Sequence, residues 1–200
     1  MAVEEELLGI RDLFRKRAQD EVVGTRILIA SLDLKFTELM KNDCHCYSQF
    51  YATPTETVFE SSQELLKAIR QGYDIVHLFC DVSSDGNIMD GRGNATTATD
   101  LLQCCSESDA KLVWLASENK PEGYIQGFKA AGDPLNLVLT IDRRGPRFSI
   151  FLESLLRKMS AGETMPVAWV SVSPQNSNDP RNQDAPACIF SAGRGGVRLR

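Results

Sequence analysis

Hydrophobic residues in this chain occur in two kinds of segment. Some form short, continuous apolar runs of β-strand length, and others recur at spacings of three and four, as they do in amphipathic helices. The runs lie at 26–32, 73–80, 111–117, 135–141 and 187–193, and the helical segments lie at 3–19, 61–72, 99–107, 122–131 and 147–161. Continuous apolar strands that alternate with helices are typical of a parallel sheet covered on both faces. The pattern therefore predicts an α/β fold, a three-layer α/β/α sandwich with a mostly parallel sheet.

Local signals define the ends of two predicted helices. Ser61 or Ser62 can cap the helix at 61–72, and Gly72 can end it. A short polar side chain caps the first turn well, and glycine adopts the left-handed conformation that often follows the last turn. For the helix at 99–107, the expected cap is Thr99 or Asp100.

Four other segments have less regular patterns. Within residues 34–60, Pro54 is expected to separate a helix from a short strand or turn. The polar, glycine-rich stretch at 83–97 predicts a hairpin or loop, and the stretch at 174–186 predicts a polar loop. PVAWVSVS at 166–173 fits either a strand or a helix.

Composition and charge are those of a single globular domain. The 200 residues are 42% hydrophobic and 24% charged, with a net charge of −5. This apolar content is enough for one core, so we expect one domain at 25–200 after an N-terminal segment, 1–24. The negative charge argues against a nucleic-acid partner, and no apolar run reaches the ~20 residues that cross a bilayer. Nothing in the composition calls for a cofactor.

The N-terminal segment is acidic and amphipathic. It does not have the pattern of a secretory signal, so we expect a cytoplasmic protein whose six cysteines are reduced thiols. Its helix at 3–19 carries an apolar stripe of Leu7, Ile10, Leu13 and Phe14. Such a stripe needs a partner surface, either on the chain's own domain or on a second copy of the chain in a homo-oligomer.

Acidic and amide side chains follow several of the predicted strands. Asp81 follows the strand at 73–80, Glu118 and Asn119 follow the strand at 111–117, and Asp142 follows the strand at 135–141. Asp33 stands in the same position after the first strand. In open parallel sheets, functional groups gather beyond the carboxyl ends of the strands. These residues are therefore the candidate site.

The order of these motifs resembles that of the CHAT domains, a caspase-like family of the clan that contains caspases, gingipains and separases. The motifs that carry the resemblance are YDIVHLFCD (73–81), KLVWLASEN (111–119), PLNLVLTID (134–142), FSIFLESLLRKMSAGE (148–163) and PACIFSAG (186–193). Together they cover nearly all of residues 26–193. The resemblance implies a caspase-like fold for residues 25–200, with a cleft that accepts an extended peptide.

The resemblance fails at the two catalytic positions. Asp81 stands where the family has its catalytic histidine, and Glu118 stands where it has its nucleophilic cysteine. His77 matches an earlier, non-catalytic histidine inside the strand. Cys80 is next to the base position, but strand alternation turns neighbouring side chains to opposite faces. The resemblance therefore implies a pseudopeptidase that acts as a protein-interaction or scaffold module, as part of a signalling or defence assembly.

Three interpretations of the acidic pair remain open. The site has drifted after losing its dyad, or it is a retained pocket that binds a basic side chain of a peptide through Asp81, Glu118, Asn119 and Asp142. The third is a metal-assisted hydrolase that uses Asp81, Glu118 and Asp142 as its carboxylate cluster.

Cys44, His45 and Cys46 raise the question of a zinc site. Structural zinc needs four ligands, commonly two spaced pairs, and only His77 and the adjacent Cys104 and Cys105 are available to complete the set. We therefore expect these cysteines to be ordinary thiols in a strand or turn, and no metal.

Overall fold

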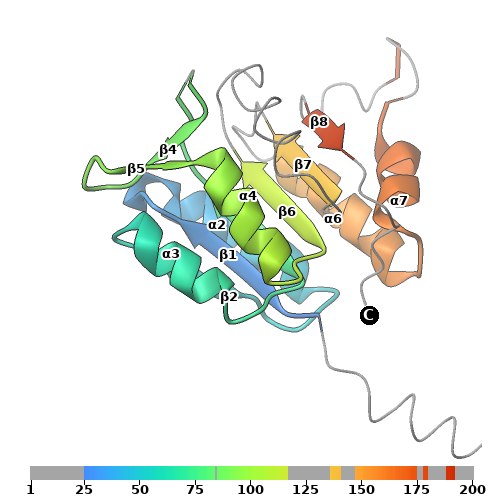
Figure 1. Cartoon of the computed structure of the whole chain (residues 1–200). Helices are drawn as coiled ribbons and strands as arrows, with labels where there is room; N and C mark the ends of the chain where they lie inside the picture. The colour runs from blue at the N-terminus through green and yellow to red at the C-terminus, as the bar shows by residue number, and fades with distance from the viewer. Residues whose placement is uncertain are drawn as a thin grey trace, which may run out of the picture.

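The computed structural model describes residues 25–83, 85–116, 136–140, 147–174, 178–179 and 188–191, with the backbone alone for 136–140 and 188–191. Six strands form the main sheet in the order β2-β1-β3-β6-β7-β8 (Figure 1). They are β1 (Ile27–Ser31), β2 (Thr55–Val58), β3 (Ile75–Phe79), β6 (Leu112–Ala116), β7 (Asn136–Thr140) and β8 (Cys188–Ser191). The first five pair in parallel, and β8 is antiparallel to β7.

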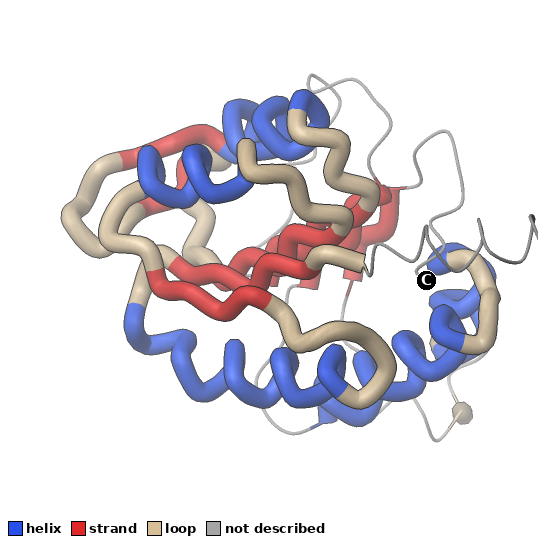
Figure 2. Tube along the Cα trace, turned by 90° about the horizontal axis from the view of Figure 1, so that it is seen from below, coloured by secondary structure: helices blue, strands red, loops and turns tan. Residues whose placement is uncertain are grey.

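Helices cover both faces of this sheet, so the predicted three-layer α/β/α sandwich with a mostly parallel sheet is confirmed (Figure 2). One face carries α2 (Thr37–Ser48), α6 (Arg147–Ser160) and α7 (Met165–Val172), and the other carries α3 (Ser62–Ile69) and α4 (Ala98–Glu107). Each face has its own hydrophobic core, which we call the first core on the α2 face and the second core on the α4 face.

The central strands explain why the apolar runs are continuous. Every residue of β1, β3 and β6 is buried. Alternate side chains point to opposite faces of the sheet, so Ile75 packs in the first core and its neighbour Val76 in the second. A strand that serves two cores needs apolar residues at nearly every position.

The helix caps follow the predictions at one helix and differ at the other. The Ser61 hydroxyl accepts a hydrogen bond from the Glu64 N–H at 3.3 Å, and Gly72 after α3 has a φ of 81°, both as predicted. Helix α4 is capped by Thr97, not by Thr99 or Asp100. The Thr97 hydroxyl oxygen accepts from the Asp100 N–H at 3.0 Å, so the helix begins at Ala98, one residue earlier than predicted, and Asp100 lies inside its first turn.

The irregular segments also have defined structures. Pro54 separates α2 from β2, as predicted, and the stretch at 83–97 contains the antiparallel hairpin of β4 (Asn87–Met89) and β5 (Ala95–Thr97). The ambiguous stretch at 166–173 is helical. The predicted helices at 3–19 and 122–131, and most of the predicted loop at 174–186, lie outside the described residues.

A polar network joins the amino-terminal ends of three strands. The Asp74 carboxylate accepts from the Arg26 N–H at 2.9 Å and lies 2.6 Å from the Lys111 ammonium. The Arg26 guanidinium donates to the Gln71 carbonyl oxygen at 2.9 Å and lies over the Tyr73 ring. These contacts tie the starts of β1, β3 and β6 together at the edge opposite the candidate site.

Among the helices that the structure describes, none has the length and apolar character needed to span a membrane.

Candidate functional site at the carboxyl edge of the sheet

Strands β3 and β6 are neighbours. They precede positions 81 and 118, where CHAT domains have their catalytic residues. β3 pairs with β6 in parallel, and Phe79 is opposite Ala116 in the last rung. The Cys80 N–H donates to the Ala116 carbonyl oxygen at 3.2 Å, so the ladder continues one step further. Asp81 and Glu118 each follow that rung by two residues. Glu118 itself, together with Asn119 and Asp142, lies outside the described residues.

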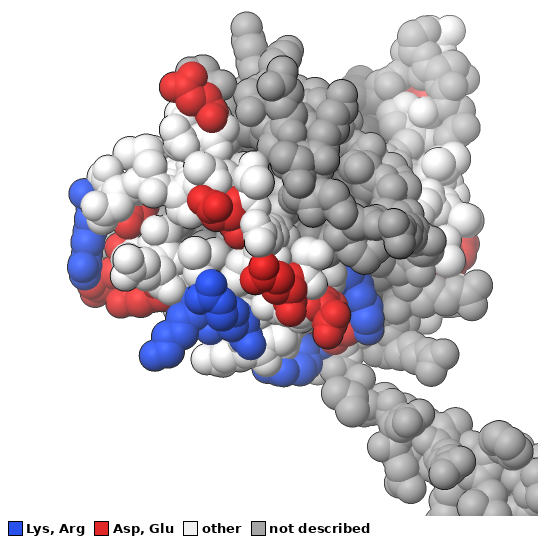
Figure 3. Space-filling model, in the orientation of Figure 1, with Lys and Arg blue, Asp and Glu red and all other residues white. Residues whose placement is uncertain are grey.

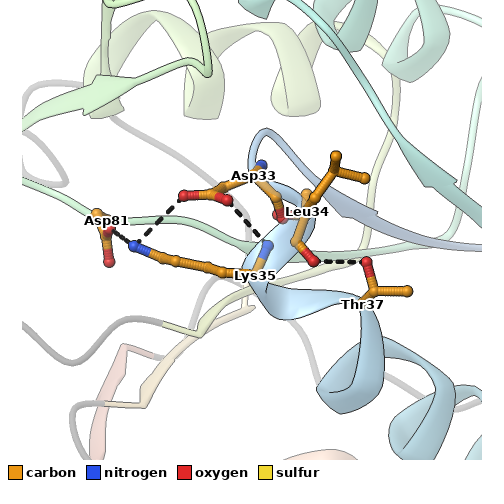
Figure 4. A network of polar contacts seen from close by, with 6 residues as sticks. Asp33, Leu34, Lys35, Thr37 and Asp81 are labelled. Atoms are coloured by element: carbon orange, nitrogen blue, oxygen red, sulfur yellow. Dashed lines mark hydrogen bonds and ion pairs between the residues drawn. The ribbon is translucent and has the colours of Figure 1, made fainter.

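Among the described residues, the ionic partner of Asp81 is a lysine from the loop after β1. The Lys35 ammonium contacts the Asp81 carboxylate and lies 3.5 Å from the Asp33 carboxylate (Figure 4). The ammonium thus lies between two acids from neighbouring strand ends. In a sheet of this strand order, the chain reverses its winding between β1 and β3, which is where ligands bind in open α/β folds.

Short-range hydrogen bonds hold the loop after β1 in place. The Ser31 hydroxyl accepts from the Asp33 N–H and donates to the Asp33 carbonyl oxygen, both at 2.9 Å. The Asp33 carboxylate accepts from the Lys35 N–H at 2.9 Å and so caps the 3-10 helix η1 (Leu34–Phe36). The same carboxylate therefore positions the lysine backbone and faces its ammonium.

The electrostatics of this group favour a charged lysine. The hydrogen bond to Asp81, together with the negative charges of Asp81 and Asp33, raises the pKa of Lys35 above its usual value, against the opposing effect of burial. The ammonium stays protonated at neutral pH, so it is no nucleophile. All three side chains are half-exposed, and exposed ion pairs contribute about 0–1 kcal/mol each. The group therefore adds little to stability.

The metal interpretation gains no support from the described residues. No cluster of three metal-binding side chains occurs among them. At Asp33 and Asp81, the Lys35 ammonium already supplies the positive charge that a cation would bring. Two of the three carboxylates in that hypothesis, Glu118 and Asp142, lie outside the described part of the chain.

Neither histidine of the chain is placed to act as a base next to Asp81. The sequence contains two. His77 is fully buried in the middle of β3, stacked between the rings of Phe79 and Trp114 at centroid distances of 4.9 and 5.4 Å. His45 is exposed on α2, eight residues beyond its first residue Thr37 and thus about 12 Å along the helix.

The first core contains a buried polar group that was not predicted from the sequence. The His77 Nε2 lies 3.2 Å from the Asp43 Oδ2, and its Nδ1 lies 3.5 Å from the Tyr47 hydroxyl. All three side chains are fully buried. The signal was present in the sequence: Met40, Asp43 and Tyr47 share one face of a helix, which places an acid in an apolar stripe. This group packs the core and has no contact with solvent.

The cysteines are placed for packing. Cys80 is buried in the second core, and burial, with the charge of Asp81, raises the pKa of its thiol well above the usual value. It is therefore no thiolate nucleophile, in agreement with the strand alternation. Cys44 and Cys46 lie on helix α2, not in the strand or turn that the sequence suggested.

The remaining candidates for a zinc site are also too dispersed. Cys104 and Cys105 belong to the second core, whereas Cys46 and His77 belong to the α2 side of the sheet. The sheet separates the two sets. Burial raises the pKa of Cys44 as well, with the charge of Glu56 adding to the effect, so this half-buried thiol has no enhanced reactivity.

Charges of both signs share the described surface. On the face in Figure 3, lysine and arginine side chains lie in several separate places, with acidic side chains between them. No continuous basic surface covers the described part of this face, and such a surface is what nucleic-acid binding usually requires.

No protein-family model matches the chain, and no curated protein matches its sequence. The resemblance to CHAT domains therefore rests on the motifs in the sequence.

Proposed function

We propose that this chain is a catalytically inactive caspase-like domain of the CHAT type, which binds a basic segment of a partner protein at the carboxyl edge of its sheet. The observation that carries the proposal is the position of Asp81. Asp81 follows β3, at the position where CHAT domains have their catalytic histidine, and it forms an ion pair with Lys35. A carboxylate in that position is suited to recognising a cation, not to activating a thiol.

The positions of the histidines and cysteines support the loss of peptidase activity. A cysteine peptidase needs a thiolate with a histidine beside it. Neither histidine is next to Asp81: His77 is buried inside the core, and His45 lies on α2. Two of the six cysteines lie at this edge. Cys80 directly precedes Asp81, but its thiol is buried in the second core. Cys188 begins β8 opposite the last residue of β7, Thr140. It is three strands from β3, about 14 Å.

The exposed residues around Asp81 support a binding role. Asp33, Lys35 and Asp81 carry one net negative charge and are half-exposed. Leu34, in the same loop, is 76% exposed, and Figure 4 shows its side chain directed away from the ion pairs. A partner segment that pairs a lysine or arginine with an apolar residue would complement both features.

Binding of short labelled peptides tests this proposal. We expect peptides with Arg-Leu pairs to bind more tightly than the same peptides with Glu-Leu pairs, measured by fluorescence anisotropy. Asp81→Asn should weaken the binding because it removes the charge and keeps the shape. Asp109→Asn is the matched control: Asp109 is exposed at the opposite edge with a φ of 58°, which asparagine tolerates. Equal binding of both peptide sets would contradict the proposal.

The absence of turnover needs its own experiment. We expect no cleavage of a diverse peptide mixture followed by mass spectrometry, with or without added Mg²⁺, Ca²⁺ or Mn²⁺. Cleavage that requires a metal and is lost in Asp81→Asn would support the metal-assisted hydrolase instead. Metal-independent cleavage that is blocked by thiol alkylation would restore the peptidase.

A further inference from the structure

Helix α7 has an outer face that is poorly suited to water. Its eight residues, MPVAWVSV, include no charged side chain. Met165 and Ala168 are fully buried, whereas Val167 is 57% and Val170 is 63% exposed. The two valines are three residues apart, so they lie on the same side of the helix. A helix that is apolar on all sides is normally covered on all sides.

Helix α6, which packs against α7, also carries an exposed apolar side chain. The half-buried Trp169 packs on Phe151 of α6, with ring centroids 4.9 Å apart. Ile150, next to Phe151, is 55% exposed. Of the five exposed large hydrophobic residues in the described chain, three are on these two helices. We call Ile150, Val167 and Val170 the α7 patch.

The same chain contains an apolar surface of matching character. The predicted helix at 3–19 has its stripe of Leu7, Ile10, Leu13 and Phe14, flanked by charged residues of both signs. The α7 helix itself offers no charge to attract a polar or ionic partner. An amphipathic helix that buries its stripe on the patch and keeps its charges in water would satisfy both surfaces.

The start of the described chain lies at the same end of the molecule as the base of α7 (Figure 1). The described chain starts at Thr25, just before β1, and Figure 1 shows the start of β1 and the connection between α6 and α7 at the same end of the molecule. Residues 20–24 can span up to about 17 Å when extended, and a helix over 3–19 is about 25 Å long.

From these observations we infer that residues 3–19 dock their apolar stripe on the α7 patch of the same chain. This contact would make α6 and α7 the support for the N-terminal segment. The inference is independent of the proposed function, since none of its residues belongs to the candidate site.

Tryptophan fluorescence tests the contact in the full chain. The protein has two tryptophans, and Trp114 is fully buried, so a change in acrylamide quenching reports on Trp169. Ile10→Gln should increase quenching, because it weakens the stripe and uncovers α7. Asp12→Gln, on the opposite side of the predicted helix, is the matched control and should leave quenching unchanged. Trp169→Phe should abolish the difference. Equal quenching in the two variants would overturn the inference.

Disulfide trapping identifies which copy of the chain supplies the helix. With Val170→Cys, we expect Ile10→Cys to form a disulfide within the monomer, located by mass spectrometry, and Asp12→Cys to form far less of it. A disulfide found only in dimers would assign the patch to a second copy and would overturn docking within one chain. No preference for Ile10 over Asp12 would overturn the use of the stripe.

Discussion

Two clusters in this molecule each pair an aspartate with a basic side chain, but one cluster is buried and the other is exposed. In the first core, Asp43, His77 and Tyr47 are fully buried under α2. At the carboxyl edge, Asp33, Lys35 and Asp81 are half-exposed. Water and salt screen the second group, so its members are available to other partners, whereas the buried group must be satisfied within the protein. His77 therefore serves the packing of the core, whereas the charged side chains at the edge stay exposed to solvent and to other molecules.

Removal of the buried acid should have the largest effect. Asp43→Ala leaves His77 in the core without its acid, which we expect to lower the free energy of unfolding by about 3–5 kcal/mol. Asp81→Ala should lower it by less than about 1 kcal/mol. Urea denaturation of both variants measures the difference. A loss in Asp43→Ala as small as that in Asp81→Ala would mean that the buried pair has no structural importance.

A double variant sharpens this result. Asp43→Leu together with His77→Phe replaces both polar partners by apolar side chains. Such a replacement is often much less harmful than the loss of one partner, so we expect the double variant to be more stable than Asp43→Ala. If the double variant is the less stable of the two, the polar group itself specifies the packing of the core.

Acid should reduce the stability that Asp74 contributes at the amino-terminal edge of the sheet. Burial raises the pKa of Asp74, but hydrogen bonds from Lys111 and the Arg26 N–H, with their positive charges, outweigh it and lower the pKa. A lowered pKa in the folded state stabilises the protein above about pH 3.9, the ordinary value for aspartate, and that contribution is lost as pH falls through the lower folded value.

Asp74→Asn isolates this contribution. We expect it to lower the free energy of unfolding at pH 7 by about 1–2 kcal/mol, since hydrogen bonds to a charged group are lost at a partly exposed position. The difference from the wild type should shrink below about pH 4. Urea denaturation at pH 7 and at pH 3 gives both values. A difference that grows in acid would assign the effect to another group.

The smallest effect on stability, with a distinct effect on binding, is expected at Lys35. Lys35→Met uncovers two carboxylates and should change the free energy of unfolding by less than about 1 kcal/mol. Basic peptides should bind the variant more tightly at low salt, because the internal cation no longer competes with them. Anisotropy titrations measure this. Weaker binding would mean that Lys35 itself contacts an acidic group of the ligand.

The sequence predicted the fold more fully than the site. Strands β1, β3 and β6 were predictable because their burial on both faces removes polar residues from the run. The cap of α4 was misplaced because Thr97 and Thr99 offer the same hydroxyl chemistry, and only the backbone decides between them. The partner of Asp81 was missed because Lys35 is 46 residues away in the chain. Strand order creates that contact, and no local pattern encodes it.

Central to the proposed function is the prediction that Asp81 and Glu118 lie side by side, because each follows the last rung of β3 and β6 by two residues. A disulfide forms when Cα atoms are about 4.4–6.8 Å apart, and neighbouring strands are about 4.8 Å apart. We predict that the variant with Asp81→Cys and Glu118→Cys forms an internal disulfide, found by mass spectrometry after mild oxidation. The control with Asp81→Cys and Gln71→Cys, at opposite edges of the sheet, should form none. Equal yields in the two variants, or no disulfide between positions 81 and 118, would contradict the account.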